Sequence, residues 1–168
     1  SSATNMKKIG HVKRVATERG FPLVFFGESS GARMPDNMGA KGMGANLGHD
    51  PQQYVRSRET PWASAVLGQC YGSSAWYTCL SDFTVMRKGA IMAVASAGLA
   101  SFAIGEQVEA EDLGGWQLHE RVTGLVDRVV DTDEEASDEI KRFLSYMPSN
   151  HNEAPPEAPV PSGSADAA

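Results

Sequence analysis

The hydrophobic and polar positions of this chain follow two patterns, one typical of amphipathic helices and one typical of buried strands. Apolar residues recur at intervals of three and four over residues 5–19, which predicts an amphipathic helix with a basic outer face. Continuous apolar runs at residues 22–26 and 63–67 predict strands that are buried on both faces. The chain therefore begins with a helix and continues into a strand.

Further segments extend this alternation along the chain. We expect helices over residues 74–81, 100–108, 111–121 and 133–146, and strands over residues 83–86, 91–94 and 125–130. Thr132 and Glu135 form a capping box that opens the last helix. A polar, glycine-rich stretch at residues 35–61 predicts a long loop with a short helix around residues 52–58. This order is typical of an α/β fold with mostly parallel pairing.

Length and composition limit the classes of function. A chain of 168 residues fits one domain, which we place at residues 1–147. Residues 148–168 are rich in proline and poor in large apolar side chains, which predicts a linker or a disordered tail. The net charge of −6 argues against nucleic-acid binding and gives no support for binding to an acidic membrane surface. The apolar runs are too short to span a bilayer.

Two cysteines, Cys70 and Cys79, leave a disulfide open, but the chain shows no secretory segment. Reduced thiols in a cytoplasmic protein are therefore favoured. No CxxC pair or His/Cys cluster has the spacing of a metal site, so we expect no metal.

Two turns of small residues carry the candidate chemistry. They occupy residues 27–33 and 68–75, and each follows a predicted strand. Small side chains allow a ligand to approach backbone N–H groups closely. The second turn also leads into a predicted helix, whose first N–H groups and dipole would point at that ligand. The two turns together predict a paired amide site for a carbonyl oxygen that becomes negative during a reaction.

Five segments at residues 28–34, 68–74, 80–86, 113–124 and 143–148 carry motifs of one family in its order and at closely similar spacing. They resemble D-S-G-G-A-R-I, G-P-C-A-G-G-A, L-T-D-F-x-x-M, L-G-G-x-x-x-H-x-x-x-S-G and F-L-S-Y-L-P. These motifs belong to the carboxyltransferase (beta) subunits of biotin-dependent acyl-CoA carboxylases of the propionyl-, acetyl- and methylcrotonoyl-CoA carboxylase type. The resemblance implies a crotonase-like (ClpP/crotonase) β-β-α spiral fold and an incomplete N-terminal carboxyltransferase domain.

The resemblance also implies which residues act. The backbone of Gly72 and Ser73 would be catalytic and would form an oxyanion hole for an acyl-CoA enolate. The acyl-CoA would contact the first turn at Ser30, Gly31, Ala32 and Arg33. The chain departs from the family pattern at both turns, because the family's two glycines become Ser30-Gly31 in the first and Gly72-Ser73 in the second.

Three side chains receive structural interpretations at this stage. Asp82 is expected to cap or anchor a strand end. Arg33 is expected to hold its turn through hydrogen bonds to carbonyls, with contact to a CoA phosphate as the alternative. His119 follows Gly114 and Gly115, and a lone helical histidine is more often packed or capped than catalytic.

The implied co-substrate is carboxybiotin on a partner carrier protein, and the implied substrate is a coenzyme A thioester. The partners would be a biotin carboxylase and biotin carboxyl carrier subunit, and the full-length protein would be a homo-oligomer. One alternative is an acyl-CoA decarboxylase alpha-type subunit, and another is a non-catalytic homologue that acts as a scaffold. A crotonase hydratase or isomerase would need a pair of glutamates near the second turn, and residues 68–81 contain none.

Overall fold

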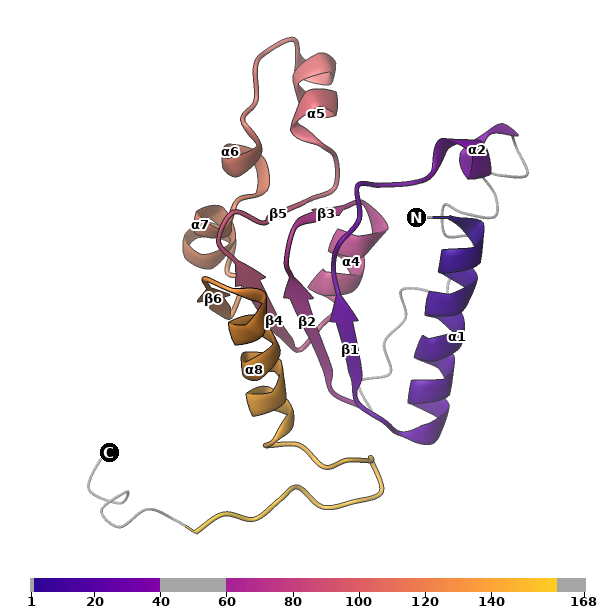
Figure 1. Ribbon diagram of the computed structural model, residues 1–168, viewed down its shortest axis with the longest axis vertical. Coiled ribbons are helices and arrows are strands. Elements are labelled where there is room, and N and C mark those ends of the chain that lie inside the picture. The colour runs from indigo at the N-terminus through magenta and orange to yellow at the C-terminus, as the bar shows by residue number, and fades with distance from the viewer. Residues whose placement is uncertain (1, 40–59, 160–168) are drawn as a thin grey trace.

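The computed structural model describes residues 2–39 and 60–159, which form an α/β arrangement with two parallel sheets (Figure 1). The larger sheet has the strand order β1-β2-β4-β6, and the smaller sheet pairs β3 with β5. The strands are β1 (Leu23–Phe26), β2 (Trp62–Val66), β3 (Gln69–Tyr71), β4 (Phe83–Arg87), β5 (Ile91–Ala93) and β6 (Arg128–Val130). The predicted parallel pairing is confirmed, since each pair of named strands is parallel.

Helices surround these strands and connect them. They are α1 (Ala3–Arg19), α2 (Met34–Asn37), α4 (Ser73–Cys79), α5 (Ala97–Ile104), α6 (Ala110–Gly114), α7 (Trp116–Leu118), the π-helix η2 (His119–Thr123) and α8 (Asp133–Leu144). Twice in succession the chain runs strand, strand, helix, first as β2-β3-α4 and then as β4-β5-α5. Among the described residues, no helix is long and apolar enough to cross a membrane.

The larger sheet separates two hydrophobic clusters because side chains alternate across a strand. On one face Ala63 and Ala65 of β2 pack with Ile140 of α8. On the other face Val66 of β2 and Met86 of β4 pack with residues of β3, α4 and β5. Figure 1 shows α8 over the sheet on one side, while α1 lies beside the β1 edge. The second turn therefore belongs to the second cluster, and α8 stabilises the face remote from it.

The helix ends follow the signals in the sequence. The capping box at Thr132 and Glu135 is confirmed, with Glu135 N–H donating to Thr132 Oγ1 at 3.1 Å. Gly20 is the left-handed C-cap of α1 with φ 76°. Asp82 anchors a strand as expected, since its Oδ2 accepts the Trp62 N–H at 2.9 Å. These contacts set where α1, β2 and α8 begin or end.

The chain beyond residue 147 returns to the end of α1. The His151 N–H donates to the Gly20 carbonyl at 2.9 Å, and the Asn150 side-chain amide donates to the Arg19 carbonyl. Residues 150 and 151 therefore supply hydrogen-bond donors to the C-terminal end of the first helix. The predicted boundary between a domain at 1–147 and a tail at 148–168 stays a prediction.

Four element predictions need correction. The predicted loop at residues 35–61 begins within the short helix α2. Residues 69–71 are a strand paired with β5, not part of a turn. The single helix predicted over residues 111–121 is divided, because Gly115 is extended with φ −73° and ψ 167°. The helix predicted over residues 100–108 lies earlier, at α5, where Ser96 accepts the Leu99 N–H as an N-cap. The short helix predicted around residues 52–58 lies outside the described residues.

Candidate functional site

The second turn joins β3 to α4 through Gly72, which has φ 66° and ψ −126°. The Gly72 N–H donates to the Ala93 carbonyl of β5 at 3.2 Å, so this hydrogen is already engaged. The next N–H groups, of Ser73 and Ser74, open α4 and have no acceptor within the described part of the chain. Such amides are the unpaired donors of a helix N-terminus. Of the predicted catalytic pair, the amide of Ser73 is therefore the one available to an external oxygen.

The first turn is tied to β3. The Ser29 N–H donates to the Gln69 carbonyl at 2.6 Å, and the Tyr71 N–H donates to the Ser29 carbonyl at 3.0 Å. Ser29 and Cys70 thus form a parallel bridge that extends the smaller sheet. The Gly31 N–H donates to the Ser29 hydroxyl at 3.2 Å. The amides of Ser29 and Gly31 in the first turn are consequently engaged in hydrogen bonds to β3 and within the turn.

The remaining residues predicted to bind acyl-CoA lie at the surface. Ser30 and Ala32 are exposed, and the Arg33 guanidinium lies 3.6 Å from the Asp36 carboxylate at the start of α2. The hydrogen bonds from Arg33 to turn carbonyls that the sequence suggested are absent from its contacts with the described residues. The acyl-CoA-binding role of Ser30, Gly31, Ala32 and Arg33 stays a prediction.

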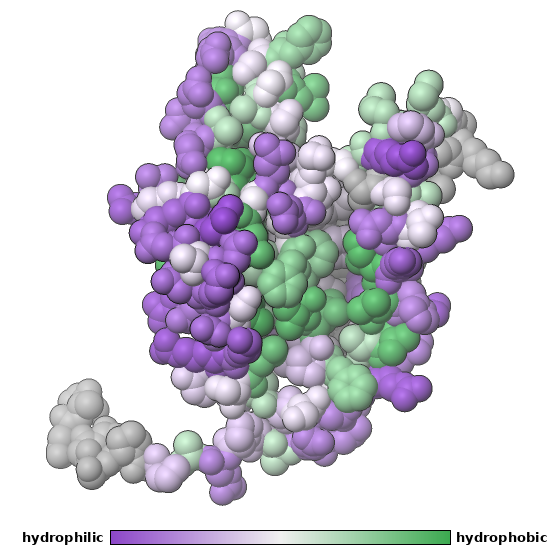
Figure 2. Space-filling view, viewed as in Figure 1, coloured by the Kyte–Doolittle hydropathy of each residue, from purple (hydrophilic) through white to green (hydrophobic). Residues whose placement is uncertain are grey.

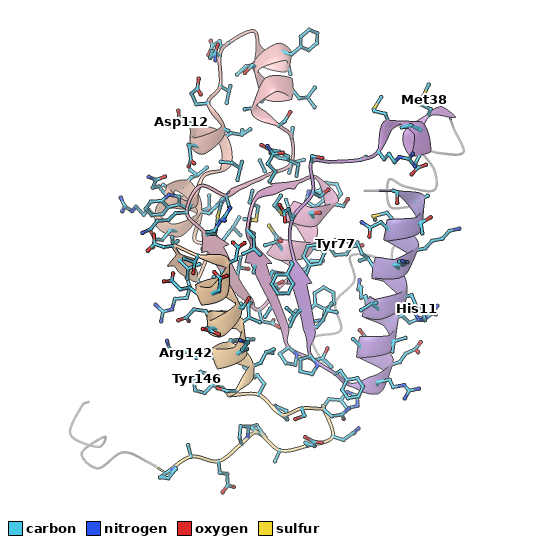
Figure 3. All side chains as sticks on the ribbon, in the orientation of Figure 1. His11, Met38, Tyr77, Asp112, Arg142 and Tyr146 are labelled. Atoms are coloured by element: carbon cyan, nitrogen blue, oxygen red, sulfur yellow. The ribbon has the colours of Figure 1, made fainter. Side chains whose placement is uncertain are left out.

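A recess of about 290 Å³ lies between α1, the end of β1 and the start of α4. Its apolar wall comes from α1, β1 and α4, at Met6, Ile9, Phe25, Phe26 and Tyr77. Its polar wall comes from Asn5 and from the two turns, at Glu28, Ser29, Ser73 and Ser74. In Figure 3 Tyr77 projects towards α1, and Figure 2 shows apolar surface over the middle of this face. The lining of the recess is more polar than apolar, with the polar groups of the two turns beside apolar side chains of α1, β1 and α4. A site that combines polar and apolar walls suits an acyl group joined to a carbonyl.

The recess brings Ser73 together with Ser29 and Ser74, which lie in the two predicted turns but were not named as site residues. It also adds Tyr77 of α4, which lies outside both turns. Tyr77 is buried, and its ring lies 5.5 Å from that of Phe25. The helical period of residues 5–19 predicted an apolar face. Nothing in the sequence indicated that this face would lie towards α4.

Cys70 lies beneath both turns and is fully buried. Removal of its thiol from water raises its pKa to about 11, against a smaller opposing effect of the Thr78 hydroxyl at 3.8 Å. A thiol with so high a pKa stays protonated near neutral pH and is a poor nucleophile. Cys70 therefore packs as a small buried side chain. Cys70 and the exposed Cys79 are both free thiols.

The described residues hold no group of three or more His, Cys, Asp or Glu side chains that could bind a metal ion. The recess is bordered by the backbone amides of Ser73 and Ser74. Such donors stabilise negative charge on a carbonyl oxygen without any change in the protein's own protonation state.

Comparison with known proteins places this chain in a family. The model of the carboxyl transferase domain matches residues 1–167. The propionyl-CoA carboxylase beta chain of Roseobacter denitrificans is 31% identical over 160 residues, which cover 94% of this chain and 31% of that protein. The methylmalonyl-CoA decarboxylase subunit alpha of Propionigenium modestum is also 31% identical, over 90% of this chain and 29% of that protein.

A solved structure of transcarboxylase 12S, with methylmalonyl-coenzyme A and methylmalonic acid bound, shows the same fold. It matches with a TM-score of 0.79 and 26% sequence identity, over 93% of this chain and 30% of that one. That structure is described as a hexamer assembly. The chain thus spans about 30% of the length of the relatives and of the solved structure that it matches.

Proposed function

Because this chain belongs to the carboxyl transferase domain family, we propose that it is the carboxyltransferase component of a biotin-dependent acyl-CoA carboxylase. Carboxylate would pass from carboxybiotin to the carbon next to the thioester of an acyl-CoA. The observation that carries the proposal is the pair of amides of Ser73 and Ser74, which have no acceptor in the described part of the chain and border the recess.

The step that the chain's own residues would assist is the formation of an enolate. Negative charge then develops on the thioester oxygen, and preorganised N–H donors stabilise it. Ser73 N–H keeps the role that the sequence suggested. Ser74 N–H takes the place of Gly72 N–H, because the Gly72 hydrogen is bonded to the Ala93 carbonyl. A single such donor contributes about 3 kcal/mol to the transition state in other enzymes.

The remaining parts of the proposal follow from family membership. The repeated strand-strand-helix order supports a crotonase-like β-β-α spiral in an incomplete N-terminal carboxyltransferase domain. Acyl-CoA would lie along Ser30, Gly31, Ala32 and Arg33 before its thioester reaches α4. Carboxybiotin would arrive on a biotin carboxyl carrier subunit, and the full-length protein would assemble as a homo-oligomer, as the hexamer assembly of transcarboxylase 12S supports.

A variant at Ser73 tests the amide directly. Ser73 is the first residue of α4, a position at which proline is well tolerated although it lacks the N–H. The replacement Ser73→Pro therefore removes the donor, whereas the control Ser73→Ala removes only the hydroxyl. The probe is propionyl-CoA labelled with carbon-13 at its carbonyl, titrated into the 168-residue chain and followed by NMR.

We expect the carbonyl resonance to move downfield on binding to the native chain and to the alanine variant, because hydrogen bonds polarise the carbonyl. In the proline variant the movement should shrink and affinity should fall about two- to tenfold. Binding without any movement of the resonance would contradict the oxyanion hole. If the native chain does not bind propionyl-CoA, this would favour the alternative of a non-catalytic homologue that acts as a scaffold.

The second candidate is the same transfer in reverse, by an acyl-CoA decarboxylase alpha-type subunit. The 31% identity to the alpha subunit of Propionigenium modestum equals that to the propionyl-CoA carboxylase chain. Both reactions pass through an enolate, so both require the amides of Ser73 and Ser74. Co-purification of the native protein from its own cells separates the two candidates: a biotin carboxylase subunit supports carboxylation, and a membrane decarboxylase subunit supports the reverse.

A further inference from the structure

The imidazole of His119 lies far from the recess residues in sequence, yet it is fastened to the strand that holds the second turn. We propose that His119 is a positioning residue, which fixes β5 and through it the amides at the start of α4. The expected effect of His119 on acyl-CoA affinity rests on the function proposed above. The contact between His119 and β5, and its effect on the Gly72 hydrogen bond, are independent of that function.

Both ring nitrogens of His119 are engaged, and the side chain is buried. Nε2 lies 2.7 Å from the Met92 carbonyl oxygen, and Nδ1 lies 3.0 Å from the Thr123 hydroxyl. A carbonyl oxygen can only accept a hydrogen bond, so Nε2 must carry a proton and donate it to Met92. The imidazole is thus a fixed donor to the backbone of β5.

Met92 and Ala93 are neighbours in β5, and successive carbonyls of a strand point to opposite edges. The Met92 carbonyl points to His119, and the next carbonyl, of Ala93, accepts the N–H of Gly72 at 3.2 Å. His119 therefore donates a hydrogen bond to one edge of β5, and the other edge of β5 accepts a hydrogen bond from Gly72, the residue directly before Ser73. A displacement of β5 would change the direction of the Ser73 and Ser74 amides.

The polypeptide around His119 is built for close contact with β5. A Cβ atom at Gly114 would lie 2.3 Å from the Met92 oxygen, so only glycine fits there. Gly115 forms an antiparallel bridge with Ile91. His119 begins the π-helical turn η2, a wide turn that is frequent at functional sites. These contacts place the imidazole against β5.

Two amide variants differ only in reach. In His119→Gln the side-chain amide nitrogen can take the place of Nε2 and donate to Met92, whereas in His119→Asn it is too short. The measurement is native-state hydrogen exchange of backbone amides in the 168-residue chain by NMR, combined with titration of propionyl-CoA. The control is Asp127→Ala, which removes a side-chain hydrogen bond of 2.8 Å to the Thr84 N–H of β4 in the other sheet.

We expect the asparagine variant to raise exchange at Gly72 about tenfold relative to the amides of β2 and β4, the equivalent of one lost hydrogen bond. The glutamine variant should stay within about twofold of the native chain, and propionyl-CoA affinity should fall only in the asparagine variant. The Asp127 control should change exchange at β4 more than at Gly72.

Equal exchange at Gly72 in the two histidine variants, or an equal rise in the Asp127 control, would overturn the positioning role. If the native chain binds no propionyl-CoA, the proposed function fails, but the exchange pattern at Gly72 still decides the role of His119. Loss of folding in both histidine variants would contradict the expectation that glutamine replaces the imidazole.

Discussion

The two small-residue turns resemble each other in sequence and differ in what their amides do. In the first turn, Ser29 pairs with β3 on both sides and the Gly31 N–H is bonded to the Ser29 hydroxyl. In the second turn the Gly72 N–H is bonded to β5, but the Ser73 and Ser74 amides that follow open α4 without an acceptor in the described part of the chain.

This difference has a simple physical cause. A helix leaves its first N–H groups without intrahelical partners, and the second turn leads straight into a helix. The first turn continues through exposed residues to the short helix α2, which begins at Met34. Composition alone therefore predicts a close backbone approach at both turns. The element that follows decides which turn keeps donors for a ligand.

The largest expected effect comes from crowding the strand that supports only the second turn. We expect Gly114→Ala to lower the free energy of unfolding by about 3 kcal/mol, because the new methyl group would meet the Met92 carbonyl at 2.3 Å. Gly98→Ala in α5 is the control, since no described atom outside the local helix backbone lies within 4 Å of the added carbon. Urea unfolding measures both changes, and a similar loss in the two variants would contradict the close packing of α6 on β5.

The two turns also differ in backbone conformation, and we expect this difference to have an intermediate effect on the free energy of unfolding. Gly72 has φ 66° with ψ −126°, a combination that side chains strongly disfavour, and Gly31 has φ 110°. Neither added methyl group would clash, so the cost is conformational. We expect Gly72→Ala to cost about 2 kcal/mol and Gly31→Ala about 1 kcal/mol in unfolding free energy.

Thermal unfolding at matched pH measures this difference. A larger loss for Gly31→Ala than for Gly72→Ala would show that the first turn is the more constrained of the two.

An effect confined to alkaline pH, and absent near neutral pH, concerns Cys70, which lies where the two turns meet. Its pKa is about 11 when folded and 9.0 by ordinary reference, so the unfolded chain releases the proton first as pH rises. Stability linked to this group is therefore complete below pH 9 and falls between pH 9 and 11, by about 1.4 kcal/mol per pH unit.

Urea unfolding at pH 8 and pH 10 tests this linkage. The difference between the two values should be smaller in Cys70→Ala than in the native chain, and Cys79→Ser serves as the control. An unchanged pH dependence in Cys70→Ala would mean that Cys70 is not buried in the folded chain.

Much of the fold is predictable from local patterns. The strands β1 and β2 coincide with the two apolar runs, although only β2 is buried throughout and β1 leaves Val24 and Phe26 exposed at the edge of the sheet. The helix α8 carries its own capping signal at Thr132 and Glu135. The sequence did not predict β3, because three residues between two glycines are too few to show a hydrophobic period. Their strand conformation depends on pairing with β5. The break at Gly115 likewise depends on the bridge to Ile91, a contact distant in sequence.

The position of the candidate site stays a prediction from the sequence, and its detail depends on contacts that the local sequence does not show. The order of elements placed an amide site at the second turn, and Ser73 lies at the recess. The bond from Gly72 to Ala93 depends on β5, and the part of α1 in the wall depends on its placement beside β1. Long-range packing therefore selects the available amides from a set that the local sequence defines.

The parallel pairing of the strands also governs how this chain must fold. Leu23 of β1 lies opposite Trp62 of β2, so the two strands meet only after a long intervening segment has closed into a loop. No pair of these named strands can form as a local hairpin, because parallel neighbours need a crossover connection. The entropy of loop closure is lost before any strand contact compensates it, which makes such topologies slow to fold and exposes unpaired strand edges on the way.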